Sequence, residues 1–300
     1  METVVPLSIV VATTEGWPYA RTVLESFREE AEDAGAEIVI ADGSRRPAPA
    51  QDEIGPRTHW LSLAEDSVFR LFGLGLAEAR GEIVATTEDH CAVRPGWCAA
   101  ILRAHREHPA AAAIGGAIEN GSTDSLLDWA SYFITQGPHM APLGRGEVEV
   151  TTNEADLSFK LWALPPREAA DGPGFMAVLY TRQLARAGAE LRVDDRMVVD
   201  HFQSIGVAET SAIHFHNGRS ISGFRRLRGM TRADWLRLGV GLLLPAWRTG
   251  RAFRLGWAKG RLRPTLAASL PWALWLEYCQ GVGNMVGYAL GPGDSPRHLR

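Results

Sequence analysis

The sequence predicts an α/β protein with a mostly parallel, doubly wound sheet and a helical, apolar C-terminal appendage. Over about the first 120 residues, β-branched apolar runs typical of strands buried on both faces alternate with segments of helical periodicity. Near residue 225 this alternation gives way to a chain dominated by Trp, Leu, Gly and Arg. We therefore expect a sheet domain over residues 1–225 and a helical tail over residues 226–300.

The elements of the sheet domain can be placed in chain order. Buried runs predict strands at residues 6–13, 36–41, 60–63, 81–87 and 111–118. Apolar residues at helical spacing predict helices at residues 19–32, 67–79 and 95–105. Looser strand patterns follow at residues 148–152, 189–193 and 197–201. This alternation favours parallel strands joined by right-handed crossovers.

Charge and cysteine content exclude several classes of protein. The net charge of −4, without a long basic run, provides no field to hold nucleic acid, so we expect no nucleic-acid partner. The three cysteines form no CxxC pair, which argues against a thiolate zinc site and for a reducing compartment. Residues 1–14 lack the charged start and cleavage site of a signal peptide. We therefore expect a cytoplasmic protein.

Polar residues follow three of the predicted strands, at residues 13–15, 42–44 and 88–90. Ligands of open α/β sheets bind at the carboxyl ends of the strands. Asp42 is therefore placed to accept hydrogen bonds from a nucleoside, although Asp42-Gly43 is equally consistent with a plain turn.

The segment Glu88-Asp89-His90 carries more chemistry than the other two. Strand alternation places Glu88 and His90 on one side and Asp89 on the other. A carboxylate and an imidazole on one side suit a divalent ion that bridges a diphosphate, which leaves Asp89 to orient a ribose or a partner. The alternative is a solvated polar loop.

Several short motifs occur in a fixed order along residues 6–220. They are Leu24-Glu25-Ser26-Phe27, Asp42-Gly43-Ser44, Gly75 with Ala79, Gly81 and Glu82, Glu88-Asp89-His90, Pro95-Gly96-Trp97 with Ile101, residues 111–118, and Asn153-Glu154-Ala155. This set resembles the GT-A fold glycosyltransferases of family 2, with Glu88-Asp89-His90 at the family's D-x-D element. The resemblance implies a GT-A-like fold and transfer of a sugar from a nucleotide diphosphate sugar, UDP-sugars favoured, to a hydroxyl acceptor.

The resemblance also assigns roles on the donor side. Nucleotide and donor contacts fall on Thr13, Glu15, Asp42, Ser44, Arg70 and Asp89. Metal ligands fall on Glu88 and His90, and a histidine late in the domain completes the site, with His201 and His214 as candidates. Because an imidazole replaces a carboxylate of D-x-D, the expected cofactor is a divalent cation, Mn²⁺ or Mg²⁺, and Mn²⁺ tolerates nitrogen better.

The catalytic base is the main departure from the family pattern. Inverting members carry a carboxylate at the start of a helix, and here the matching position is Ala177. Asp171, Glu168 or, as a further alternative, Asp156 is expected to serve instead, with inversion as the expected outcome. The remaining alternatives are an acceptor that needs no base, or a catalytically degenerate relative that binds nucleotide and a partner enzyme.

The acceptor side is expected further along the chain. The residues assigned to it are Asn153, Asp156, His216 and Arg219. His214-Phe215-His216 is interpreted as an extended segment with both imidazoles on one side. A nucleotidyltransferase is disfavoured because residues 13–17 lack a glycine-rich basic loop.

The tail leaves three interpretations open. Residues 265–290 carry one formal charge, Glu277, and are long enough to cross a bilayer. Glu277, Gln280 and Asn284 form a polar stripe, and Gly283 and Gly287 have the spacing of tight helix contacts. An apolar segment at residues 235–247 is followed by six basic residues. The tail is thus an interfacial hairpin on the cytoplasmic leaflet, a helical subdomain or homodimer interface, or a membrane span. The first of these implies a peripheral protein at the inner face of the membrane and suits a lipid-linked acceptor.

Overall fold

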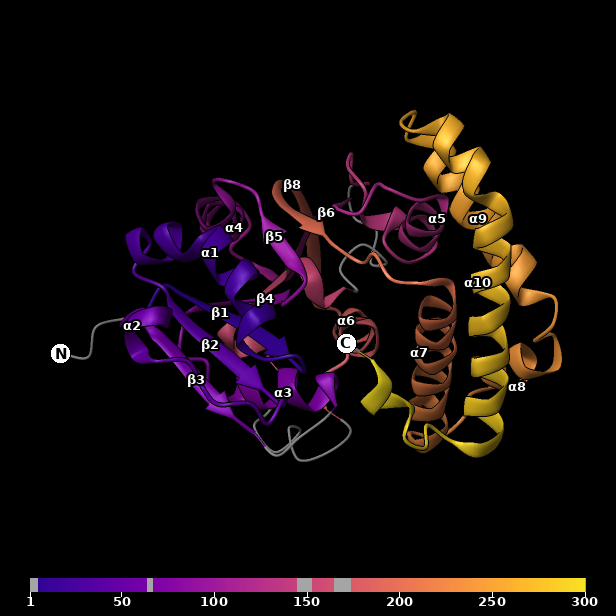
Figure 1. The fold of residues 1–300 in the computed structure, drawn as a ribbon, viewed down its shortest axis with the longest axis horizontal. Coiled ribbons are helices and arrows are strands. Elements are labelled where there is room, and N and C mark those ends of the chain that lie inside the picture. Colours follow the sequence, from indigo (N-terminus) through magenta and orange to yellow (C-terminus); the bar gives the residue numbers. More distant parts are fainter. Residues whose placement is uncertain (1–4, 64–66, 145–152, 165–173, 300) are drawn as a thin grey trace. The chain divides into compact units, whose positions relative to one another are not determined.

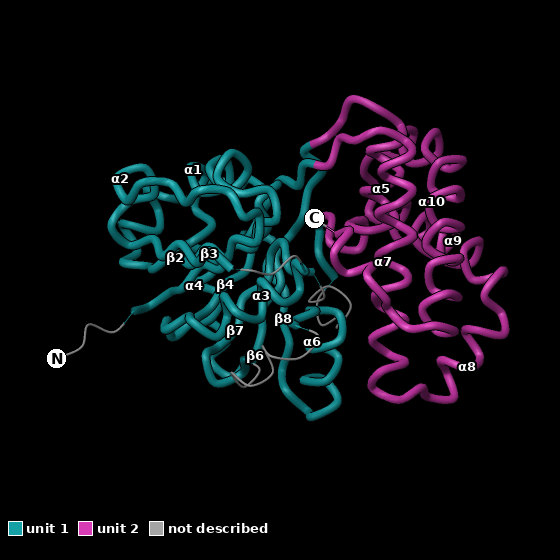
Figure 2. The backbone as a smooth tube through the Cα atoms, turned by 60° about the horizontal axis from the view of Figure 1, so that its bottom comes forward, with its two compact units in different colours: residues 1–121, 141–202, 300 teal, residues 122–140, 203–299 magenta. Residues whose placement is uncertain are grey.

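The computed structural model describes residues 5–63, 67–144, 153–164 and 174–299. The chain divides into two compact units (Figure 2), of which the second holds residues 122–140 and 203–299. The predicted boundary near residue 225 falls inside helix α7 (Val207–Leu227). Composition changes at the basic end of that helix, whereas the chain enters the second unit just after strand β8 (Glu190–His201).

The first unit is built on a mostly parallel sheet, as predicted (Figure 1). In the described part of the chain the strands are β1 (Leu7–Thr13), β2 (Glu37–Asp42), β3 (Thr58–Ser62), β4 (Ile83–Glu88), β5 (Cys91–Val93), β6 (Ala111–Asn120), β7 (Leu157–Lys160) and β8. Their order across the sheet is β3-β2-β1-β4-β7-β6-β8-β5. Strands β5 and β7 run antiparallel to their neighbours, and the other strand pairs are parallel.

Two predicted strand boundaries differ from the structure. The patterns at residues 189–193 and 197–201 belong to one strand, β8, whose pairing with β6 jumps from Val193 to Val198. Asp194 and Arg196 occupy this irregularity and form an ion pair with each other at 2.6 Å, so polar residues interrupt the apolar pattern without ending the strand. The strand predicted at residues 148–152 lies outside the described residues.

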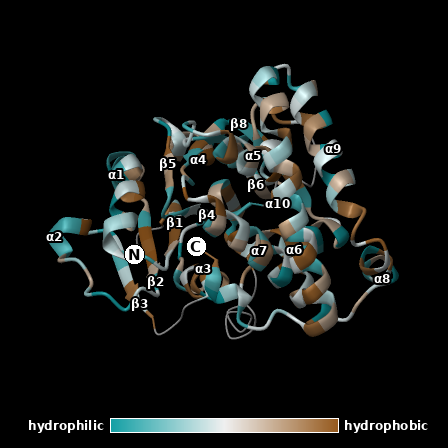
Figure 3. Cartoon of the chain, turned by 45° about the vertical axis from the view of Figure 1, so that its right-hand side comes forward, coloured by the Kyte–Doolittle hydropathy of each residue, from teal (hydrophilic) through white to brown (hydrophobic). Residues whose placement is uncertain are grey.

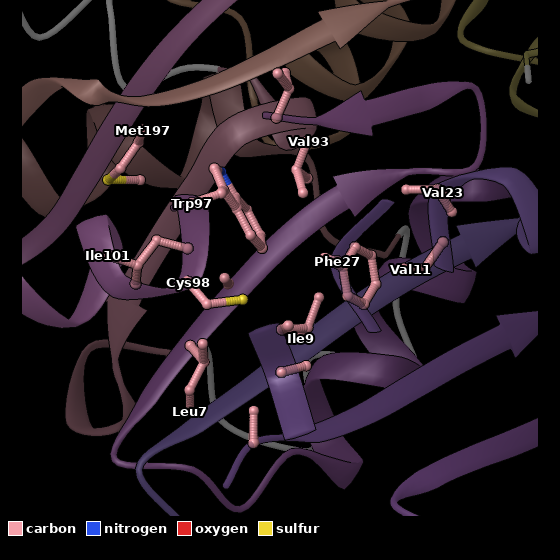
Figure 4. Packing of buried hydrophobic residues seen from close by; sticks show 14 of the residues in the cluster. Leu7, Ile9, Val11, Val23, Phe27, Val93, Trp97, Cys98, Ile101 and Met197 are labelled. Carbon is pink, nitrogen blue, oxygen red and sulfur yellow. The ribbon is translucent and has the colours of Figure 1, made fainter. Parts of the chain in front are cut away.

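Helices cover both faces of the sheet, which confirms the doubly wound prediction. On one face α1 (Trp17–Asp33) packs on β1 and β2, and α4 (Trp97–Glu107) packs on β4, β6 and β8. Figure 4 shows Ile9 and Val11 of this core among Val23, Phe27 and Trp97. On the other face α3 (Val68–Glu78) approaches β1 so closely that a Cβ on Gly75 would lie 2.6 Å from Val10. Strands β1 and β2 are buried along their whole length and appear brown in Figure 3. The short α2 (Gln51–Ile54) and α6 (Ala177–Arg186) complete the unit.

The second unit is helical. It contains α5 (Leu126–Thr135), α7, α8 (Arg232–Gly239), α9 (Leu244–Ala258) and α10 (Arg263–Leu290). A Cβ on Gly283 would lie 2.0 Å from the carbonyl oxygen of Phe215, and one on Gly287 would lie 2.4 Å from that of Arg219. The glycine spacing therefore serves a close contact between α10 and α7 of the same chain.

The polar stripe of α10 is buried inside this unit. Glu277 lies 3.2 Å from the guanidinium of Arg248, Gln280 bonds to His214, and Ser222 donates to Asn284 at 2.7 Å. Among the described helices none is long and apolar enough to cross a membrane.

Candidate active site

The carboxyl ends of β1, β2 and β4 meet at one edge of the sheet. Thr13 pairs with Asp42, and Ala12 pairs with Glu88. The loops that follow β1 and β2 also touch, because a Cβ on Gly16 would lie 2.6 Å from the Ser44 hydroxyl. The polar residues that sequence placed after three separate strands therefore share one edge, as parallel pairing requires.

Asp42 is buried at this edge, with 1% of its surface exposed. Its Oδ1 accepts a hydrogen bond from the backbone N–H of Ser44 at 2.8 Å, which shapes the Asp-Gly-Ser turn. The turn interpretation and the nucleoside interpretation are compatible, because a carboxylate has further acceptor capacity beyond this one bond.

Glu88, His90 and His201 form a group whose ligand atoms all lie within 4.8 Å of one another. The Nε2 atoms of His90 and His201 lie 3.2 and 3.3 Å from Oε2 of Glu88, and 3.0 Å from each other. Glu88 ends β4 and His201 ends β8, and Cys91, next to His90, pairs with His201. Two imidazoles and a carboxylate directed at one point suit a first-row divalent cation better than Mg²⁺.

Asp89 supports this group from the other side of the chain. Its Oδ1 lies 3.0 Å from Nδ1 of His90, and its Oδ2 accepts the hydroxyl proton of Thr13 at 2.7 Å. Thr13 in turn accepts hydrogen bonds from the backbone N–H groups of Glu15 and Gly16. A carboxylate on the far nitrogen of a metal-binding imidazole fixes the ring and its tautomer. Asp89 thus contacts both Thr13 and His90.

The charges of the group are strongly coupled. Burial alone would lower the pKa of His90, but hydrogen bonds to Asp89 and Glu88 outweigh it and raise this pKa to about 10. Burial disfavours the charge of Glu88, yet hydrogen bonds from His201 and His90 hold the pKa of its carboxyl well below the usual range. Burial and the charge of His90 lower the pKa of His201. The raised pKa of His90 and the lowered pKa of Glu88 favour an imidazolium beside a carboxylate within this group.

Comparison with known proteins decides the family. Residues 8–180 match the sequence family described as Glycosyl transferase family 2, which is more than half of the chain. The chain belongs to glycosyl transferase family 2. No curated protein matches the sequence significantly.

A solved mannosyltransferase structure supports the GT-A fold for this family 2 chain. The mannosyltransferase PcManGT from Pyrobaculum calidifontis, solved with GDP-Man and Mn²⁺, superposes with a TM-score of 0.56 at 13% identity, covering 95% of this chain and 88% of that one. S. aureus TarS 1–349, solved with UDP, gives a TM-score of 0.46 at 14% identity, covering 94% of this chain and 90% of that one.

The start of helix α6, where the resemblance leads us to expect a catalytic carboxylate, has a carboxylate beside it that sequence reasoning missed. Helix α6 begins at Ala177, and the backbone N–H of Ala177 donates to Oε1 of Glu154 at 2.5 Å. Burial and the charge of Glu88 raise the pKa of Glu154 to about 7, against the opposing effect of the Ala177 N–H. The only sequence signal for this carboxylate was the Asn153-Glu154-Ala155 motif. That motif contains Glu154, but it does not indicate that Glu154 contacts Ala177.

Other expected residues of the glycosyltransferase lie near this helix start. Asn153 caps the turn that contains Glu154, since its Oδ1 accepts the backbone N–H of Ala155 at 2.8 Å. Gly174 packs on the start of α3, where its Cβ would lie 2.5 Å from the backbone nitrogen of Arg70. Asp171 and Glu168 lie outside the described residues.

Asp156 is enclosed. It is 2% exposed, accepts a hydrogen bond from Nε1 of Trp97 at 2.9 Å, and would clash with any Cβ on Gly116. Burial raises the pKa of its carboxyl to about 8, against the effect of the Trp97 bond. A base must reach its acceptor, and this carboxyl is closed off by its own neighbours.

The other candidate residues, His214, His216 and Arg219, lie in the second unit of the glycosyltransferase. The interpretation of residues 214–216 as extended is wrong, because they lie on helix α7, which packs tightly against α10. His214 bonds to Ser131 at 3.1 Å, and His216 bonds to Ser295 at 3.0 Å. Arg219 donates to the carbonyl of Gly291. The metal-capable group found among the described residues does not include His214.

Proposed function

We propose that this glycosyltransferase moves a sugar from a nucleotide diphosphate sugar to a hydroxyl acceptor with inversion, using a divalent cation held by Glu88, His90 and His201. The convergence of these three side chains with the end of β2, where Asp42 lies, is the observation that carries the proposal. UDP-sugars are the first donors to test. GDP-mannose, the ligand of the Pyrobaculum enzyme, is the second.

Each residue at the edge has a task in this reaction. A bound cation would neutralise the departing diphosphate. Asp42 accepts hydrogen bonds from the nucleoside, and Asp89 keeps the His90 ring aligned through its bond to Nδ1. Arg70, at the start of α3, adds a positive charge for the diphosphate. Holding donor and acceptor in register supplies most of the remaining rate enhancement.

Titration calorimetry tests the donor assignment. Wild-type protein should bind UDP, a UDP-sugar or GDP-mannose in the presence of Mn²⁺, and His201→Ala should lose the Mn²⁺-dependent part of that binding. The matched control is His216→Ala, whose imidazole bonds to Ser295 in the helical unit. If none of these nucleotides binds in the presence of Mn²⁺, the proposal fails.

We also propose that the helical unit binds the enzyme to the anionic, cytoplasmic face of a membrane, where a lipid-linked acceptor would lie. Five large apolar side chains are exposed between residues 235 and 247: Trp235 60%, Leu236 66%, Leu242 65%, Leu243 73% and Trp247 63%. Exposed arginines flank them, with Arg232 before and Arg254 after. Exposed tryptophan beside basic residues is typical of interfacial binding. Figure 3 shows hydrophobic and hydrophilic residues mixed along α9.

Vesicle sedimentation tests the membrane proposal. The protein should pellet with vesicles of phosphatidylcholine and phosphatidylserine, and less with phosphatidylcholine alone. The double variant Trp235→Ser/Trp247→Ser should stay in the supernatant, while the control Trp275→Ser, on α10, should not. Equal pelleting of the double variant would contradict the proposal, and a loss of self-association in that variant would assign the surface to a homodimer instead.

The alternative is a degenerate glycosyltransferase that binds nucleotide and a partner enzyme. Ala177, where the family carries a carboxylate, is the feature that favours it. Donor binding without transfer or hydrolysis, together with a co-purifying enzyme, would support this alternative.

A further inference from the structure

The start of helix α6 is where a catalytic carboxylate was expected and where the sequence has Ala177 instead. The first N–H groups of a helix have no partner within it and carry partial positive charge, so they attract a carboxylate. Position 177 has only a methyl group to offer. A carboxylate from another part of the sequence occupies this position, because the side chain of Glu154 accepts a hydrogen bond from the Ala177 N–H at 2.5 Å.

Sheet topology brings Glu154 to the metal-capable group. Strand β7 runs antiparallel to β4, and Leu157 pairs with Thr86. The turn at Glu154–Asp156 that precedes β7 therefore lies beside the end of β4, and its residues contact that strand. The charge of Glu88 acts on Glu154 across this short separation. Glu154 is nevertheless outside the group of three ligands.

The Glu154 carboxyl is available for proton transfer. Its side chain is partly exposed, unlike that of Asp156, which is 2% exposed. Burial, helped by the charge of Glu88, raises its pKa to about 7, near the value at which a base is most efficient.

We propose that Glu154 is the general base of this glycosyltransferase and replaces in space the carboxylate that position 177 lacks. This inference rests on the proposed function. Glu154 takes the proton of the acceptor hydroxyl while the acceptor oxygen forms a bond to the anomeric carbon. The bond from that carbon to the diphosphate oxygen breaks, and its electron pair leaves with the nucleoside diphosphate. Attack from the side opposite the diphosphate inverts the anomeric centre.

The variant Glu154→Gln separates a chemical role from a structural one. The glutamine carbonyl still accepts the Ala177 N–H, but it takes no proton at neutral pH. With UDP-glucose or GDP-mannose, Mn²⁺ and water as acceptor, its kcat for nucleotide release should fall about 10²–10⁴-fold, while the donor Kd stays within about twofold. Glu209→Gln, in the first turn of α7, is the matched control and should keep wild-type kcat.

Rescue and pH dependence sharpen the test. The double variant Glu154→Gln/Ala177→Glu returns a carboxylate to the helix start and should recover at least about tenfold of the lost kcat. Wild-type kcat at saturating Mn²⁺ should fall as the pH drops below about 7, because Glu154 is then protonated, and this fall should be smaller in Glu154→Gln, where only the metal ligands still take up protons. Wild-type turnover in Glu154→Gln would overturn the inference while leaving the proposed function intact.

If hydrolysis of the donor is too slow to measure, a crystal structure with the donor bound tests the role of Glu154 instead. The Glu154 carboxylate should then face the anomeric carbon on the side opposite the diphosphate. A carboxylate turned away from that carbon overturns the inference. Failure of wild type to bind any donor would instead overturn the proposed function.

Discussion

Two buried histidines, His201 in the sheet unit and His214 in the helical unit, look alike in sequence and differ in their neighbours. They are 6% and 2% exposed, and burial lowers the pKa of each, that of His214 to about 4. His201 meets a carboxylate and a second imidazole, which are directed at one shared point. His214 meets the hydroxyl of Ser131 and the amide of Gln280, each a single partner.

The difference extends to the units that hold these histidines. In the helical unit buried polar groups pair across helices, as Glu277 does with Arg248 and Ser222 with Asn284. Such pairs place polar partners opposite each other across the helix contacts. At the sheet edge three potential metal ligands, Glu88, His90 and His201, converge on one point. Convergence of several groups on one point is thus the better indicator of function than burial alone.

Metal binding gives the largest expected contrast between the two histidines. His201→Ala removes one of the three proposed ligands and should weaken Mn²⁺ affinity at least about 100-fold, because even supporting residues around a metal contribute 10–100-fold. His214→Ala should leave Mn²⁺ affinity unchanged and lower thermal stability instead. Calorimetric Mn²⁺ titration of both variants checks this. Equal Mn²⁺ affinity in the two variants would show that His201 is no more a metal ligand than His214 is.

The parts of the site that depend on local pattern could be predicted from the sequence. Asp42 and Glu88 follow buried strands, and parallel strands bring their ends together whatever lies between them. The same logic placed the helices that cover the sheet. These predictions depend only on where the buried strands end and on the alternation of side chains along a strand.

The parts that depend on distant contacts could not be predicted. Glu154 reaches Ala177 because β7 pairs antiparallel with β4. No local sequence pattern predicts that pairing. The choice between His201 and His214 depends on partners that are remote in the chain. Residues 214–216 alternate like a strand, yet glycine contacts between α7 and α10 favour a helix there.

Helix packing in the second unit offers the next largest effect. Gly283→Ala would place a methyl group 2.0 Å from the carbonyl oxygen of Phe215, so α10 must move away from α7. The free energy of unfolding should fall by about 1–3 kcal/mol, the usual cost of overpacking. Gly250→Ala, on α9, meets nothing within 4 Å and should raise stability by about 0.8–1 kcal/mol through helix propensity. Denaturant unfolding measures both, and a neutral Gly283→Ala would contradict the close contact.

The enclosed carboxyl of Asp156 gives an effect that is visible only as a dependence on pH. Burial raises its pKa to about 8 in the folded state from 3.8, so between these values the folded protein binds more protons than the unfolded chain. Unfolding free energy from this group therefore falls as the pH rises, by at most about 1.4 kcal/mol per pH unit. Asp156→Asn keeps an oxygen for the Trp97 N–H and carries no such proton, so its stability relative to wild type should grow from pH 5 to pH 8. Thermal unfolding across that range measures the divergence, and parallel curves would show that Asp156 is ionised in place.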